Sequence, residues 1–124
     1  MNNKDAYKFS NYTNIKAIID FLEQTGKTEK DINLYEVWLL SYLVTLYTKD
    51  NTLIKKIISG KKYVFIADTL IIDNLKFSPK TRQIKNVIRK LETLGFITRH
   101  IQDKKKRFIS INEVFLKLWK CENW

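Results

Sequence analysis

The side chains that could do chemistry in this sequence are concentrated in segment 79–94, where apolar and polar residues alternate with a helical period. At about 100° per residue, one face of the predicted helix is aliphatic: Ile84, Val87, Ile88, Leu91 and Leu94. The opposite face carries Arg82, Asn86, Arg89 and Thr93, flanked by Gln83, Lys85 and Lys90. A merely solvated face, which is the alternative, usually mixes Glu with Lys for helix-stabilising pairs. A face without acids suits the major groove of duplex DNA, where Arg pairs with guanine and Asn or Gln with adenine.

The start of this segment carries a second signal. Ser78 is a good N-cap and Pro79 a good first helical residue, so a helix is predicted to begin here. The free amides of a first turn can hold a phosphate. We therefore expect Ser78, Lys80 and Thr81 to join the DNA-binding surface.

A run of four basic residues follows the predicted helix: Lys104, Lys105, Lys106 and Arg107. It lies between two β-prone segments, 96–101 and 107–112, which predicts a hairpin with a polar tip over 102–106. A nuclear-localisation stretch or a solvated turn that resists aggregation are the alternatives. The position between two strands favours a basic hairpin that grips the phosphate backbone, which positions a protein on DNA more than it specifies a sequence.

The flanking segments predict mainly helices. Segment 14–25 has an apolar stripe closed by Gly26, and 34–48, capped by Asn33, is apolar on several sides, with Trp38 as a core residue. A loop is expected over 27–33.

Shorter elements follow. Segment 53–58 predicts an amphipathic helix and 63–66 a strand. Asp68 would cap a short helix that ends before Pro79, and Asn112 would cap a last helix over 113–121.

Residues 62–112 thus follow the order strand, short helix, sharp turn, long helix, strand, basic hairpin, strand. With the turn Phe77-Ser78-Pro79-Lys80, the exit Leu91–Ile97 and the return 107–112, this segment resembles a winged helix-turn-helix. Helix 34–48 would be the first helix of its trihelical core. Among such proteins it is most similar to DNA-binding domains of plasmid replication initiators and phage replisome-organiser proteins.

The resemblance implies a mainly α fold with a small β wing and extra N- and C-terminal helices. It implies one winged-helix domain over 1–124. The parts of this domain would be an extension over 1–33, a core over 34–112 and a C-terminal helix over 113–124.

The charge is unevenly distributed. The chain has 23 Lys and Arg against 13 Asp and Glu, a net charge of +10. Residues 1–60 hold 8 basic and 7 acidic side chains, and residues 61–124 hold 15 and 6. This asymmetry favours a polyanionic partner, either nucleic acid or an anionic membrane surface, over plain solvated charge. Because the bases fall on a folded motif and not on one long amphipathic helix, we expect no membrane binding.

Enzyme chemistry is not predicted. His100 and Cys121 are the only residues of their types, so no zinc spacing or cysteine–histidine pair is available, and we expect no cofactor or metal. His100 is expected to be a surface or half-buried strand residue, and Glu92 to pair with Arg89 or Lys85. The start of the sequence has no signal-peptide pattern, and its longest apolar stretch, 37–47, is too short to cross a bilayer, so a cytoplasmic protein is expected.

Two terminal helices carry spare apolar stripes. These are Ile15, Ile18, Ile19 and Leu22 on the first, and Phe115, Leu118 and Trp119 on the last. They could pack on each other within one chain. Because paired DNA half-sites favour two-fold symmetric proteins, we expect them instead to form a homodimer interface.

Taken together, these features predict sequence-specific binding of double-stranded DNA. The protein would act as a regulator, replication or partition protein of a phage, plasmid or bacterium. The alternative is a protein-binding winged helix, such as an assembly subunit or an inhibitor of a nucleic-acid enzyme.

Overall fold

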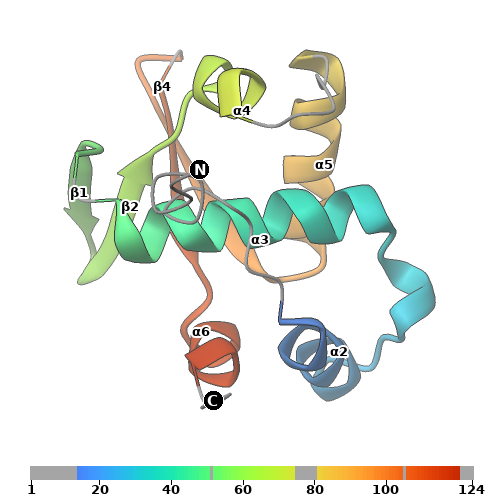
Figure 1. Ribbon diagram of the computed structural model, residues 1–124. Helices are drawn as coiled ribbons and strands as arrows, with labels where there is room; N and C mark the ends of the chain where they lie inside the picture. The colour runs from blue at the N-terminus through green and yellow to red at the C-terminus, as the bar shows by residue number, and fades with distance from the viewer. Residues whose placement is uncertain (1–13, 51, 75–80, 105, 121–124) are drawn as a thin grey trace, which may run out of the picture. The chain divides into compact units, whose positions relative to one another are not determined.

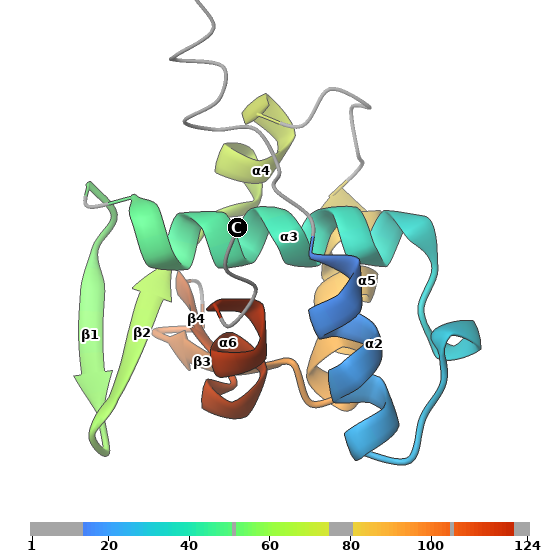
Figure 2. The same ribbon diagram turned by 60° about the horizontal axis from the view of Figure 1, so that its bottom comes forward.

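The computed structural model describes residues 14–50, 52–74, 81–104 and 106–120. Within these ranges the chain forms five α-helices, one short 3-10 helix and a four-stranded antiparallel sheet (Figures 1 and 2). The fold is therefore mixed, with more sheet than the expected small β wing.

The chain divides into two compact units. One, here called the helical unit, comprises residues 1–49 and 112–124, and the other, the sheet unit, comprises residues 50–111. The helix at 34–49 belongs to the helical unit. The grouping of 34–112 as one winged-helix core stays a prediction.

Two helices of the helical unit begin as expected. Helix α2 (Ile15–Gln24) starts at the N-cap Asn14, whose Oδ1 accepts a hydrogen bond from the Ala17 amide at 3.1 Å. Helix α6 (Glu113–Lys120) starts at Asn112, whose Oδ1 accepts from the Val114 amide at 2.8 Å. Each cap satisfies an amide that has no partner inside its own helix.

Helices α2 and α6 pack against each other (Figure 1). The rings of Phe21 and Phe115 meet edge to face at 5.6 Å, and Asn14 Nδ2 donates to the Trp119 carbonyl at 3.0 Å. Four residues of the expected dimer interface are consequently buried within the chain: Ile18, Leu22, Phe115 and Trp119.

The predicted dimer surface is therefore wrong for these four residues. Ile19 and Leu118 are half-buried, and Ile15 remains 48% exposed. The two stripes are close in space, so packing within one chain removes their apolar surface from water without a second copy.

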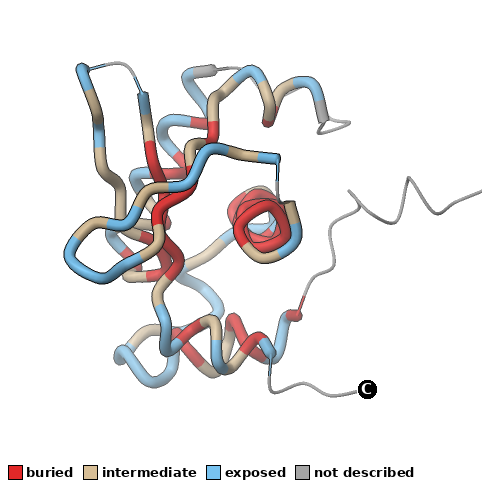
Figure 3. Tube along the Cα trace, turned by 90° about the vertical axis from the view of Figure 1, so that its left-hand side faces the viewer, coloured by how far each residue is buried: buried red, intermediate tan, exposed pale blue. Residues whose placement is uncertain are grey.

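Helix α3 (Leu34–Lys49) begins with a capping box. Asn33 Oδ1 accepts from the Glu36 amide at 2.8 Å, and Glu36 Oε1 accepts from the Asn33 amide at 2.9 Å. Every residue from Leu39 to Tyr47 is buried (Figure 3), as its apolar composition predicts. The expectation for Trp38 is wrong, because it is 39% exposed. Leu34, one turn earlier on the same stripe, is 79% exposed.

The loop expected over 27–33 contains a short 3-10 helix, η1 (Glu29–Asp31). A capping box between Thr28 and Asp31 stabilises it. All three residues of η1 are exposed.

The sheet unit begins with a hairpin where a helix was predicted. Strand β1 (Lys55–Ile58) pairs antiparallel with β2 (Lys61–Phe65), with Ile58 opposite Lys61. The connecting residues Ser59 and Gly60 both have positive φ, 52° and 79°. Two such residues form a turn that matches the twist of a hairpin. This turn overrides the amphipathic pattern of 53–58.

Two further strands complete the sheet in the order β1-β2-β4-β3. Strand β3 (Ile97–Gln102) pairs with β4 (Lys106–Ile111) from Ile97 opposite Ile111 to Gln102 opposite Lys106. Strand β4 also pairs with β2. The expected strands are confirmed, with β2 beginning at residue 61.

Two helices connect β2 to β3. Helix α4 spans Asp68–Asn74 and helix α5 spans Thr81–Thr93. The predicted turn with Ser78 and Pro79 lies outside the described residues. The core stripe of α5 is confirmed, because all five predicted residues are buried: Ile84, Val87, Ile88, Leu91 and Leu94.

A glycine ends α5 and aims the chain into β3. Gly95 has φ 92°, its amide donates to the Glu92 carbonyl at 3.0 Å, and the Phe96 amide donates to the Leu91 carbonyl at 3.1 Å. This is a Schellman motif, which needs the left-handed conformation that glycine adopts at little cost. It fixes the angle at which the β3–β4 hairpin leaves the helix.

Candidate nucleic-acid interface

The polar face predicted for helix 79–94 is exposed on α5. The predicted DNA-facing residues are exposed on it: Arg82, Gln83, Lys85, Asn86 and Arg89. Lys90 is half-buried, and Thr81 is the first residue of the helix. The exposed face of the helix thus carries basic and amide groups.

The β3–β4 hairpin presents a second set of basic side chains. Lys104 and Lys106 are exposed. Asp103 and Lys104 both have positive φ, 54° and 62°, so the chain reverses sharply there. Three predicted site residues lie outside the described residues: Ser78, Lys80 and Lys105.

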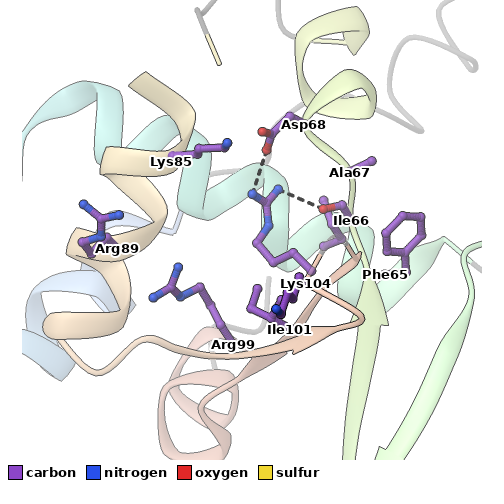
Figure 4. A pocket seen from close by; sticks show the side chains of 10 residues that line it. Phe65, Ile66, Ala67, Asp68, Lys85, Arg89, Arg99, Ile101 and Lys104 are labelled. Atoms are coloured by element: carbon purple, nitrogen blue, oxygen red, sulfur yellow. Dashed lines mark hydrogen bonds and ion pairs between the residues drawn. The ribbon is translucent and has the colours of Figure 1, made fainter. Parts of the chain in front are cut away.

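Arg107 does not extend from the hairpin tip as expected. Its side chain is only 11% exposed, its Nη1 lies 2.7 Å from Oδ1 of Asp68, and its Nη2 donates to the Ile66 carbonyl at 2.9 Å (Figure 4). Strand alternation explains this, because Arg107 shares a sheet face with the buried Ile109. Its position links β4 to the start of α4.

Asp68 also differs from its predicted role as a helix cap. Helix α4 begins at Asp68 itself, and the amides of Leu70 and Ile71 donate to the carbonyl of Ala67. The carboxylate of Asp68 is instead the partner of Arg107. A long-range ion pair thus replaces the predicted local contact.

Glu92 has a different partner from the two predicted. Its Oε1 accepts from Nε of Arg99 at 2.9 Å, and its Oε2 accepts from the Arg99 amide at 3.3 Å. Arg99 lies seven residues away on β3, beyond the Gly95 turn, so helical spacing does not predict this pair. As a consequence, Lys85 and Arg89 have no carboxylate partner in the part of the chain that the structure describes.

A cavity of about 290 Å³ lies between α5, the end of β2 and the β3–β4 hairpin (Figure 4). Its described lining includes five basic side chains from four elements or turns: Lys85, Arg89, Arg99, Lys104 and Arg107. Asp68 is the one acidic residue in that lining, and the remaining residues are apolar. In Figure 4, Lys85 extends toward the Asp68–Arg107 pair, and Arg99 extends toward Arg89. The helix face and the hairpin therefore contribute basic side chains to the same cavity.

Other candidate chemistry is not assembled in the described ranges. His100 is half-buried in β3, as predicted, with its ring 6.1 Å from Tyr63 and 6.4 Å from Phe108. No group of three or more His, Cys, Asp or Glu residues that could hold a metal occurs among the described residues. None of the described helices has the length and apolar character needed to span a bilayer.

No protein-family model, curated protein or solved structure matches this chain. Function has to follow from the chemistry of the site itself.

Proposed function

We propose that this protein binds double-stranded DNA through a winged helix-turn-helix over 34–112, with α5 of the sheet unit as its recognition helix and the β3–β4 hairpin of the same unit as its wing. The order β2, α4, α5, β3, β4, with β4 paired to β2, supports this assignment. One observation carries the proposal. Lys85 and Arg89 of the outer face of α5 line the same cavity as Lys104 of the β3–β4 hairpin.

The first turns of α5 would read bases. Arg82 and Asn86 lie four residues apart and both are exposed. Arg can donate two hydrogen bonds to guanine, and Asn can donate to and accept from adenine, in the major groove. A helix of about 10–12 Å diameter fits that groove.

The hairpin would hold the sugar-phosphate backbone. Lys104 and Lys106 flank its tip, and flexible ammonium groups suit phosphate contacts that do not depend on sequence. Such contacts release condensed counterions, so affinity would depend steeply on salt.

In the cell, this activity suits a cytoplasmic regulator, replication or partition protein of a phage, plasmid or bacterium. It needs no cofactor and no catalytic residue. A homodimer would need an interface other than the buried α2 and α6 stripes.

A protein partner is the second candidate. It is favoured by Leu34 and Trp38, an exposed apolar pair one turn apart on α3. Exposed aromatic residues are frequent in protein interfaces. An acidic protein surface could then meet the basic face of α5 in place of DNA.

Titration of labelled duplex DNA over a range of salt concentrations tests the proposal. We expect binding at low salt, with log affinity falling by about 0.9 per neutralised phosphate for each tenfold rise in salt. A selection from random duplexes would then identify the preferred site. Absence of detectable binding at low salt would exclude DNA and favour the protein partner.

A further inference from the structure

The cavity of the sheet unit has an excess of positive charge that nothing in its described lining neutralises. Arg107 is paired with Asp68 at 2.7 Å, and Arg99 with Glu92 at 2.9 Å. Lys85, Arg89 and Lys104 lack a carboxylate partner among the described residues. Like charges held around one hollow repel each other, so an anion bound between them lowers the electrostatic energy.

Two of the cavity's arginines are already held in place. The Arg107 guanidinium is fixed on one side by Asp68 and on another by the Ile66 carbonyl. Glu92 holds Arg99 through its Nε, which leaves the terminal nitrogens of Arg99 as donors. A guanidinium that is fixed before the ligand arrives loses less conformational entropy on binding and matches the planar fork of oxygens on a phosphate.

The size and the apolar walls of the cavity limit what it can hold. Its volume of about 290 Å³ lies just below the roughly 300–1,000 Å³ common for small-molecule pockets. Phe65, Ala67 and Ile101 form the apolar part of its lining. The space suits a phosphate and its attached sugar atoms better than a whole cofactor.

We infer that this cavity binds one phosphate group, with Lys85, Arg89 and Lys104 supplying charge and Arg99 supplying a pre-positioned fork. When the phosphate belongs to the DNA backbone, the inference rests on the proposed function. A backbone phosphate held in the cavity would fix the position of α5 along the DNA, because Lys85 and Arg89 of the cavity belong to the same helix as the base-reading side chains. A free phosphorylated molecule is the other source of the same chemistry.

The first experiment uses inorganic pyrophosphate as the probe and amide NMR shifts of the full chain as the readout. We expect shift changes at 66–68 and 99–107 that sodium chloride at equal ionic strength does not produce. The Lys85→Gln, Arg89→Gln double variant should lose them. The matched control Lys55→Gln, Lys61→Gln removes the same charge from exposed positions outside the cavity lining and should keep them.

The second experiment measures the salt slope for random duplex DNA with the same two double variants. The cavity variant should lower the slope by about 1 unit more than the control, the contribution of one phosphate. DNA binding with equal slopes and no pyrophosphate shifts in the cavity would overturn the inference and leave the proposed function standing. Pyrophosphate shifts confined to the cavity without DNA binding at low salt would support the cavity, make a free phosphate its ligand and exclude the proposed function.

Discussion

The two units of this chain differ most in charge. The helical unit holds 8 Lys and Arg against 8 Asp and Glu, a net charge of zero. The sheet unit holds 15 against 5, a net charge of +10, which is the net charge of the whole chain. A stable core and a charged binding surface are separate requirements of a small protein. The net charge that a binding surface needs is concentrated here in the sheet unit.

Charges also have different neighbours in the two units. In the helical unit, Lys16 pairs with Asp20 one turn later at 3.0 Å, a contact that stabilises the helix locally. In the sheet unit, Asp68 and Glu92 each bind an arginine from another element. The exposed basic side chains Lys85, Arg89 and Lys104 have no carboxylate partner among the residues that the structure describes. This difference supports the proposal that the sheet unit binds an external anion.

The largest effect on stability is expected from a substitution in the core of the helical unit, which should leave the salt dependence of DNA binding unchanged. Phe115→Ala removes a fully buried ring that contacts Phe21 and Trp119 in the helical unit. We expect it to lower the free energy of unfolding by about 3–5 kcal/mol, because it leaves a cavity. Urea denaturation measures this change. The salt slope for DNA should be unchanged in the folded variant, and a changed slope would show that charge and core are not separable.

The next effect concerns the Asp68–Arg107 ion pair, which lines the cavity. Asp68→Ala leaves the guanidinium of Arg107 buried without its carboxylate and should cost about 2–3 kcal/mol of unfolding free energy. Adding Arg107→Met to this variant should restore part of the loss. A double-mutant cycle by denaturation measures the coupling, and additive losses would contradict a direct interaction.

A third substitution tests base reading. Arg82→Ala should weaken binding to the selected site by about 1–3 kcal/mol and affect random duplex DNA much less. Competition binding on the two DNAs measures the difference. For comparison, Lys104→Ala with Lys106→Ala should weaken both DNAs about equally and lower the salt slope by about 1–2 units. Equal losses on both DNAs for Arg82→Ala would mean that α5 grips phosphate without reading sequence.

The smallest effect is expected at the half-exposed pair between α5 and β3. Glu92→Gln keeps the side-chain shape, so the loss of stability should stay below about 1 kcal/mol. Removing this negative charge should slightly tighten binding to random duplex DNA at low salt. Glu23→Gln, an exposed acid of the helical unit, is the charge-matched control and should change DNA binding less. An equal gain in both variants would show that only total charge matters.

The sequence by itself determined the features that depend on neighbours within a few residues. The caps at Asn14, Asn33 and Asn112, the buried stripe and basic face of α5, and the β3–β4 hairpin all follow from local hydrogen bonds and from the helix and strand periods. Five of the predicted DNA-facing side chains of α5 are exposed for the same reason: Arg82, Gln83, Lys85, Asn86 and Arg89.

Only the tertiary structure decided which distant groups meet. Nothing near Glu92 or Asp68 in the sequence indicates Arg99 or Arg107, because strand register and the Gly95 turn bring these pairs together. Whether the apolar stripes of α2 and α6 are buried within the chain or exposed depended likewise on how close the two helices lie. An apolar stripe needs a partner surface, but periodicity does not specify which one. The basic cavity has the same origin, because its five cations come from segments that only the folded sheet unit places around one hollow.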